Sequence, residues 1–469
     1  MGPSRTGTPA RAARTIDSSR VSGALVLFTR DLRVHDQPAL AAAAREFDEI
    51  VPAFVLDREL LRGTCGSPNR VQFLLECLRD LQASLAARGA QLVVREGDVV
   101  EEALRVAHEH DLGAIYMSAD VTPYARRRHQ RLARACEHER VQLRTYPGVT
   151  VVEPGRLTPS GGDHYRVFTP FWRVWSELPG GPLVRAPTRL RAPGTLVRTA
   201  LPALSKIARG QTAPSLQRGG EGAARARLER WLARAAQSYA QGRDELAEDG
   251  TSRLSAYLHF GCLSPRSVLE RARARAGTEA FVRQLCWRDF HHQVLAARAD
   301  LPRADYRPRG DRWRRDEPAL AAWHDGLTGY PIVDAGMRQL QAEGYMHNRA
   351  RLIVGSFLTK TLYLDWRSGA AHFARLLLDA DVANNVGNWQ WVAGTGNDTR
   401  PNRVLNPIRQ ARRFDPNGAY VRRYVPELAG VAGSAVHEPW KLGGARRALA
   451  YTERIVDYAA ALAEYRARH

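Results

Sequence analysis

Apolar runs and helical patterns alternate over the first 150 residues. The apolar runs are short, partly β-branched, and lie at 24–29, 50–56, 90–94 and 114–119. Between them, apolar residues recur at helical spacing, most clearly over 70–89, which ends at a glycine. Strands that are apolar at nearly every position are typical of parallel sheets with helices on both faces. The pattern therefore predicts a doubly wound α/β domain over residues 23–150, with ligands at the carboxyl ends of its strands.

The pattern changes near residues 150 and 222. Residues 151–222 are rich in glycine and proline and lack periodicity, which indicates a long connector with one short helix near 168–175. From 223 to 469, long segments repeat apolar residues at helical spacing, so a second, all-α domain is expected. Residues 1–22 are polar and basic without the apolar stretch of a signal peptide, and we interpret them as a disordered tail.

The net charge of the chain limits the kinds of molecule that it is expected to bind. The chain has a formal net charge of +20 at pH 7, and lysine occurs only at Lys206, Lys360 and Lys441. Such an excess favours a polyanionic partner such as nucleic acid, although a GC-rich coding sequence also enriches arginine. The five cysteines form no CxxC pair, which argues against metal sites and a disulfide scaffold. The scattered cysteines fit the reducing cytoplasm of a bacterium, and no run of 18 apolar residues occurs, so we expect no membrane span.

One predicted helix, at 279–298, carries a polar and aromatic face. Gln284, Trp287, Arg288 and His291 fall at i, i+3, i+4 and i+7, and so lie on the same side of the helix. Apolar residues occupy another face that can meet the core. The polar face is either a surface with a half-exposed tryptophan or a cavity wall that binds a planar, polar ligand.

Hydroxyl residues stand immediately before another helical run. Thr251, Ser252 and Ser255 have the composition of an N-cap cluster. The alternative is that these hydroxyls and the free backbone amides of a helix start bind a phosphate group. The pattern alone leaves both interpretations open.

A third segment repeats polar residues and an indole at helical spacing. Asp381, Asn385 and Trp389 share one face, and Asp379 lies close by in the sequence. Inside a domain such a face is unfavourable unless its polar groups are paired. A ribose, an adenine or a ring N–H of a ligand would pair them.

Seven ordered stretches carry a family resemblance. They read FTRDLRVHDQPAL, YRVFTPFWRVW, GTSRLS, QLCWRDF, GYPIVDAGMRQLQAEGYMHNRARLIVGSFLTK, DWR and DVANNVGNWQWVAGTGNDTRPNRVLNP. Together they resemble the photolyase/cryptochrome family from about residue 24 to residue 441. Any one stretch could arise by chance, whereas the ordered set hardly could. The resemblance implies an N-terminal α/β domain, a helical domain that binds FAD, and UV-damaged DNA as the partner.

The resemblance also assigns roles to individual residues. The residues expected to bind FAD are Tyr239, Thr251, Ser252, Arg253, Leu254, Ser255, Arg288, Asn348, Arg351, Asp379, Ala380, Asp381 and Asn385, the last at flavin N5. The residues expected to contact DNA or its lesion are Arg243, Gln284, Trp287, Arg288, His291, Asn348, Arg349, Trp391 and Gln410. Those expected to transfer electrons are Trp313, Trp366 and Trp389. Trp287 and Trp391 resemble the aromatic walls around a pyrimidine dimer that is flipped out of the duplex.

Two positions bear on the substrate. Members that repair cyclobutane dimers usually carry Glu at the position of Gln284, and Gln there also resembles members that repair the (6-4) photoproduct. Those members carry His at the position of Asn348, so the retained Asn favours the cyclobutane dimer. The resemblance thus implies light-dependent dimer repair by electron transfer from photoexcited, reduced FAD, with a (6-4) photolyase as an alternative.

A different alternative is a light-sensing cryptochrome, which signals through a partner and repairs nothing. Both lesion-wall tryptophans are present, and only a short segment follows residue 441, which favours repair. A plain flavin oxidoreductase would need a nicotinamide site, and none is visible. We expect the protein to act as a monomer.

A second, light-harvesting chromophore is also implied. Folate-type members use a Cys-Lys pair in the loop that here reads Pro302-Arg303. An arginine-rich composition is typical of GC-rich bacteria, some of which make deazaflavins. We therefore expect an 8-hydroxy-deazaflavin rather than methenyltetrahydrofolate, with Asp120 at the end of the fourth strand as a contact.

Overall fold

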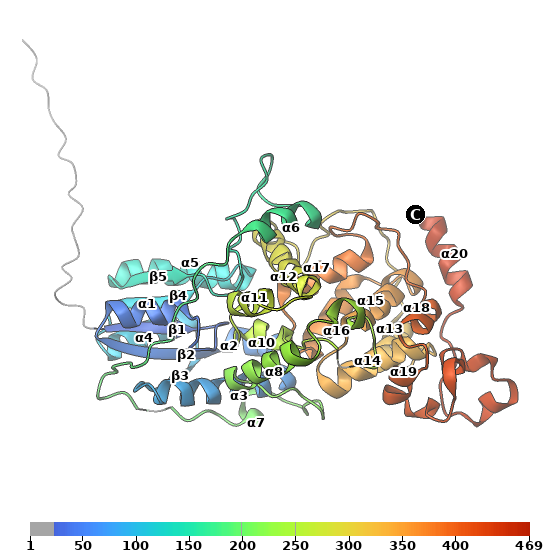
Figure 1. Ribbon diagram of the computed structural model, residues 1–469, viewed down its shortest axis with the longest axis horizontal. Helices are drawn as coiled ribbons and strands as arrows, with labels where there is room; N and C mark the ends of the chain where they lie inside the picture. The colour runs from blue at the N-terminus through green and yellow to red at the C-terminus, as the bar shows by residue number, and fades with distance from the viewer. Residues whose placement is uncertain (1–22, 198, 249) are drawn as a thin grey trace, which may run out of the picture.

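The chain forms an α/β part at one end of the molecule and a helical part at the other (Figure 1). The computed structural model describes residues 23–197, 199–248 and 250–469, so the predicted disordered tail lies outside the described residues. Within these ranges, no helix combines the length and the apolar composition that a membrane crossing requires.

The α/β part is built on one parallel sheet. Its strands are β1 (Gly23–Phe28), β2 (Glu49–Asp57), β3 (Val93–Gly97), β4 (Ala114–Ser118) and β5 (Gln142–Tyr146). They follow the order β3-β2-β1-β4-β5, and all neighbours are parallel. This order confirms the predicted doubly wound sheet and puts its topological switch point between β1 and β4. The sequence pattern missed β5, because this edge strand has exposed or half-buried side chains and no apolar run.

Helices cover both faces of the sheet. They are α1 (Pro38–Glu46), α2 (Arg58–Arg62), α3 (Pro68–Ala86), α4 (Val99–Glu109) and α5 (Pro123–Glu139). One face, with Leu25 and Leu27 of β1, packs against α4 and α5 in a core of its own. The opposite face, with Val26 and Phe28, belongs to a larger core that continues through the helical part. The two parts therefore share buried surface.

The connector and the helical part supply the remaining helices. The connector contains α6 (Phe168–Glu177), close to the predicted position, and α7 (Leu204–Ile207). The helical part contains α8 (Glu221–Arg234), α9 (Tyr239–Gly242), α10 (Ser255–Phe260), α11 (Pro265–Arg273), α12 (Glu279–Ala297), α13 (Glu317–Asp325), α14 (Pro331–Glu343), α15 (Asn348–Ser356), α16 (Trp366–Leu376), α17 (Val382–Ala393), α18 (Pro407–Phe414), α19 (Ala419–Tyr424) and α20 (Tyr458–Arg468). A π-helical turn, η2 (Phe357–Thr361), follows α15 directly. Short 3₁₀ turns lie at Thr64–Gly66, Pro426–Leu428, Gly433–His437, Pro439–Lys441 and Gly443–Ala448.

Candidate active site

A cavity of about 590 Å³ lies in the helical part, among α9, α10, α12, α15, α16 and α17. It collects the predicted residues Tyr239, Arg243, Thr251, Ser252, Arg253, Leu254, Ser255, Gln284, Trp287, Arg288, His291, Asn348, Arg349, Arg351, Asp379, Asp381, Asn385, Trp389 and Trp391. The predicted residues outside its lining are Asp120, Trp313, Trp366, Ala380 and Gln410. Lining residues that the sequence did not single out include Asp244, His259, Arg283, Tyr345 and Asn384. Segments far apart in the chain thus surround one space.

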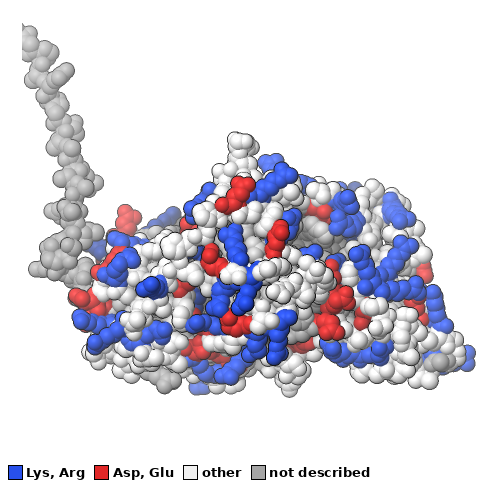
Figure 2. Space-filling model, viewed as in Figure 1, with Lys and Arg blue, Asp and Glu red and all other residues white. Residues whose placement is uncertain are grey.

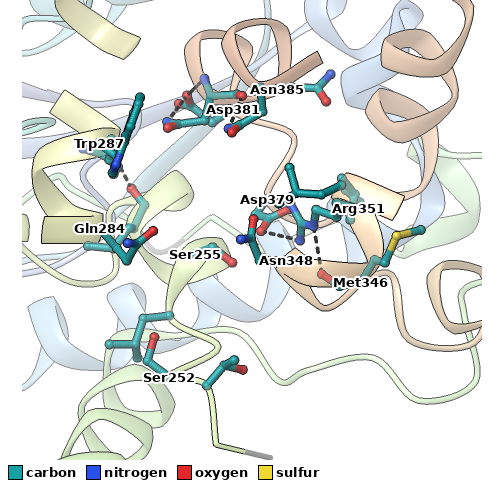
Figure 3. A pocket seen from close by; sticks show the side chains of 18 of the residues that line it. Ser252, Ser255, Gln284, Trp287, Met346, Asn348, Arg351, Asp379, Asp381 and Asn385 are labelled. Atoms are coloured by element: carbon teal, nitrogen blue, oxygen red, sulfur yellow. Dashed lines mark hydrogen bonds and ion pairs between the residues drawn. The ribbon is translucent and has the colours of Figure 1, made fainter. Parts of the chain in front are cut away.

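Helix α12 supplies one wall of this cavity. Its i, i+3, i+4, i+7 face lines the space, which favours the cavity-wall interpretation of that pattern. Gln284 and Trp287 come from this side, and Arg351 and Met346 come from the opposite side (Figure 3). Arg288 donates hydrogen bonds to two backbone carbonyls, which fix its guanidinium at the cavity.

The loop before α10 lines the cavity without capping the helix. Of the two interpretations left open, the N-cap cluster is wrong, because the residue at the N-cap is Leu254, whose side chain has no acceptor. The backbone reaches this residue through a left-handed conformation at Arg253, with φ of 51°. Thr251 Oγ1 lies 3.2 Å from the Tyr345 hydroxyl, and Ser255 lines the cavity. Hydroxyl groups on a cavity wall suit a ligand with phosphate or sugar oxygens.

Arg351 and Asp379 form an ion pair on the cavity wall (Figure 3). Arg351 Nη2 lies 2.9 Å from Asp379 Oδ2, and its Nε donates to the Met346 carbonyl at 2.8 Å. Burial raises the pKa of Asp379, but the charge and hydrogen bond of Arg351 outweigh burial and hold the pKa below its usual value. Asp379 Oδ1 has no hydrogen-bond partner among the described residues. This ionised carboxylate can therefore accept a hydrogen bond from a ligand.

A second carboxylate, Asp381, connects the cavity to the α/β part. Its Oδ1 accepts from the Asn384 backbone N–H at 2.9 Å and caps α17, while Oδ2 accepts from Arg30. Arg30 follows β1 and also pairs with Asp120 at 3.2 Å, at the end of β4. Burial raises the pKa of Asp381, but His292 and Arg30 hold it well below its usual value. One buried ionic network thus joins the switch point of the sheet to the cavity.

Helix α17 presents an amide and an indole to the cavity. Asn385 Nδ2 donates to the Ala370 carbonyl at 3.0 Å. The amide oxygen Oδ1 can therefore accept a hydrogen bond from a ligand. Trp389 is 4% exposed, and its Nε1 has no hydrogen-bond partner among the described residues. Helices α16 and α17 pack tightly here, because a Cβ at Gly369 of α16 would lie 2.2 Å from the ring of Trp389 in α17.

The three tryptophans assigned to electron transfer differ in burial. Trp389 lines the cavity, Trp366 is fully buried at the start of α16, and Trp313 is half-buried. Arg314 and Leu364 form an isolated parallel β-bridge, which brings the segments that carry Trp313 and Trp366 together. Trp323, which no motif pointed to, contacts Trp389 with 6.0 Å between ring centroids. In the sequence, Trp323 has only the helical spacing of an apolar residue, which does not distinguish it from any other core residue.

The residues assigned to DNA have mixed surroundings. Trp391 is half-buried, and the Arg403 guanidinium lies over its ring, 5.3 Å from the centroid. Arg349 lines the cavity and pairs with Asp244 at 2.8 Å. Gln410 lies in α18, outside the cavity lining. On the face shown in Figure 2, Lys and Arg side chains are spread over both ends of the molecule, interspersed with Asp and Glu.

Comparisons with known proteins agree with this geometry. The family model described as DNA photolyase matches residues 24–189, and the FAD binding domain of DNA photolyase matches residues 281–469. The chain is 52% identical to a deoxyribodipyrimidine photo-lyase of Streptomyces griseus, over 96% of this chain and 98% of that protein. Among solved structures, a bacterial class III photolyase from Agrobacterium tumefaciens matches with a TM-score of 0.89 and 32% identity, over 97% of this chain and 98% of that one. A cryptochrome from Synechocystis sp. PCC6803 matches with a TM-score of 0.89 and 29% identity, over 95% and 99%. The chain therefore belongs to the DNA photolyase family.

Proposed function

We propose that this protein repairs cyclobutane pyrimidine dimers in DNA with light absorbed by a bound FAD. The observation that carries the proposal is the shared cavity, because Trp287 and Trp391 line the same space as the polar groups assigned to the flavin. Two half-buried indoles offer flat surfaces on which bases pulled out of a duplex can stack. A dimer held between them would lie in the cavity that holds the flavin.

The walls of the cavity have the chemistry that FAD requires. Asp379 Oδ1 and Trp389 Nε1 are buried polar atoms without partners among the described residues, and a ligand with matching groups would satisfy them. The free Oδ1 of Asn385 can accept a hydrogen bond from a ring N–H. The hydroxyls of Thr251, Ser252 and Ser255, at the start of α10, suit the phosphate and sugar oxygens. When bound and reduced, FAD supplies a photoexcited electron donor for the dimer.

Asn348 and its neighbour His347 support the cyclobutane dimer as the substrate. Repair of a (6-4) photoproduct is expected to need a proton-donating histidine in the cavity, where this chain has Asn348. His347 lies outside the cavity lining, and its Nδ1 accepts from the Arg349 backbone N–H at 3.1 Å as the N-cap of α15. Burial lowers the pKa of His347 to about 4, so at neutral pH it is an uncharged imidazole and not the imidazolium that would serve as the acid. Gln284 of α12 lines the cavity and can hydrogen-bond base edges without carrying charge.

The test is repair of a UV-irradiated oligonucleotide with a defined cyclobutane dimer. We expect blue light, and not darkness, to restore the intact pyrimidines, with Trp313, Trp366 and Trp389 passing electrons inward to keep the flavin reduced. A protein that binds FAD and leaves the dimer intact would instead fit a light-sensing cryptochrome. A substrate in chromosomal DNA would place the activity at the nucleoid, in the cytoplasm.

A second light-absorbing group is proposed at the carboxyl ends of the strands. Arg128 of α5 is buried beside Asp57 and Asp120, and its Nε has no hydrogen-bond partner among the described residues. Asp120 is already engaged by Arg30 and by two backbone N–H groups, so Arg128 is the better candidate for a direct contact. The acidic ring hydroxyl of an 8-hydroxy-deazaflavin would bring an anion to this buried cation, which favours it over methenyltetrahydrofolate.

The absorbance spectrum of protein purified from its own host tests this antenna. We expect a deazaflavin band besides the flavin bands, and its loss in Arg128→Gln while the flavin bands stay. A spectrum with flavin bands alone, or with a folate band, would contradict the proposal.

A further inference from the structure

Helix α6 of the connector packs behind the cavity wall formed by α12. Its first residue, Phe168, stacks face to face on Trp287, with ring centroids 3.7 Å apart and an interplanar angle of 3°. Phe168 is 6% exposed and does not belong to the cavity lining, whereas Trp287 does. The phenyl ring therefore covers one face of the indole from behind. Contact over a whole ring face resists tilting of the indole, because any tilt separates many atom pairs at once.

Further aromatic and cationic groups hold this pair in place. Phe290 of α12 meets both rings edge-on, 5.7 Å from Phe168 at 87° and 5.5 Å from Trp287 at 85°. The Arg283 guanidinium lies over Phe168 and over Trp172 of α6, at 4.9 and 5.3 Å from the ring centroids. The indole plane is thus fixed by residues from two helices, one of them in the connector.

We propose that Phe168 is a positioning residue of the lesion pocket. By covering one face of Trp287, it leaves the opposite face as the stacking surface for a flipped-out base. The inference rests on the proposed role of Trp287 as a lesion wall. Only a flipped-out base uses this surface, so Phe168 should act on the discrimination between damaged and undamaged DNA. It should act on neither flavin binding nor general affinity for DNA.

The test compares the same substitution at two positions of α6. Phe168→Leu keeps an apolar side chain and removes the stack. Phe171→Leu is the matched control, because Phe171 is 2% exposed and its ring pairs with those of Tyr165 and Phe290 rather than stacking on Trp287. We expect Phe168→Leu to weaken binding to a dimer-containing duplex by roughly 2- to 12-fold, the range that corresponds to one aromatic pair. Its binding to undamaged duplex and its flavin content should match those of Phe171→Leu.

A double-mutant cycle with Trp287→Ala separates positioning from a general loss of packing. If Phe168 acts through Trp287, adding Phe168→Leu to Trp287→Ala should cause no further loss of lesion binding. Equal lesion binding by Phe168→Leu and Phe171→Leu, or full additivity in the cycle, would overturn the inference. If Trp287→Ala itself binds the dimer as well as the wild type does, the lesion-wall assignment fails first, and the inference falls with it.

Discussion

At the scale of single residues, the neutral amide at position 284 bears on substrate choice. Gln284 lines the cavity on the same helix face as Trp287, where it can donate and accept hydrogen bonds without charge. A protonated glutamic acid of similar size can donate a hydrogen bond to the negatively charged dimer that electron transfer produces. We therefore expect Gln284→Glu to retain or increase repair of cyclobutane dimers, measured on oligonucleotides with one defined lesion. Parallel assays on a (6-4) substrate should show no repair by either form, and repair there by the wild type would refute the substrate assignment.

A substitution at Trp389 should separate electron supply from dimer repair. Of the three tryptophans assigned to electron transfer, Trp389 lines the cavity, so in the proposed route it would be the last link before the flavin. Trp389→Phe should strongly suppress light-driven reduction of the flavin by an external thiol, followed by flavin absorbance. Repair by enzyme that has been reduced chemically should survive, because the dimer takes its electron from the flavin directly. Loss of both activities in this variant would show that Trp389 has a structural role instead.

At the scale of elements, the π-helical turn η2 contains a buried lysine, Lys360, that forms hydrogen bonds with three other segments. Lys360 Nζ donates to the Ala393 carbonyl at 2.6 Å and the Pro401 carbonyl at 2.9 Å, and lies 2.7 Å from the Tyr465 hydroxyl of α20. Lys360→Met would leave two buried carbonyls without this donor. We expect a loss of about 1–3 kcal/mol in the free energy of unfolding, measured with denaturant at fixed pH. Lys206→Met in α7 is the control.

The same lysine predicts a pH dependence of stability. Burial lowers the pKa of Lys360 from 10.5 to about 7, so between these values the unfolded chain binds more protons at this site than the folded chain. The contribution of Lys360 to stability is therefore lost as the pH falls from about 10 to 7. As the pH rises from about 7 to 10, the free energy of unfolding of the wild type should therefore increase more than that of Lys360→Met. Identical pH profiles for the two proteins would show that Lys360 does not titrate there.

Elements with strong periodicity could be predicted from the sequence, and those defined by tertiary contacts could not. Apolar runs marked β1 to β4, whereas the half-exposed edge strand β5 gave no such signal. The hydroxyls before α10 had the composition of a cap, but the backbone conformation at Arg253 puts Leu254 at the cap position. The Arg30–Asp381 pair joins residues 351 positions apart, and no local pattern reports such a contact. The cavity residues were predicted mainly through the ordered motifs.

At the scale of the whole molecule, the α/β part is connected to the cavity by a shared core and by ion pairs. They share a hydrophobic core, and Arg30 bonds Asp120 on one side and Asp381 on the other. The carboxyl ends of β1 and β4, where a doubly wound sheet commonly binds a ligand, therefore abut the helix start that carries Asn385. An antenna at this edge would lie against the same network that positions α17.

The net charge of +20 determines how the whole molecule should bind DNA. Binding that neutralises phosphates releases counterions, so affinity falls as a power of the salt concentration. If about four phosphates are neutralised, affinity for a dimer-containing duplex should fall about tenfold for each doubling of salt, with little dependence on the flanking sequence. Arg243 at the cavity lining is a candidate for one of these contacts, and Arg243→Gln should reduce the slope by about one for damaged and undamaged duplex alike. Arg45→Gln on α1 is the matched control and should leave the slope unchanged. An affinity that does not respond to salt would contradict phosphate-driven binding and favour a protein that signals rather than repairs.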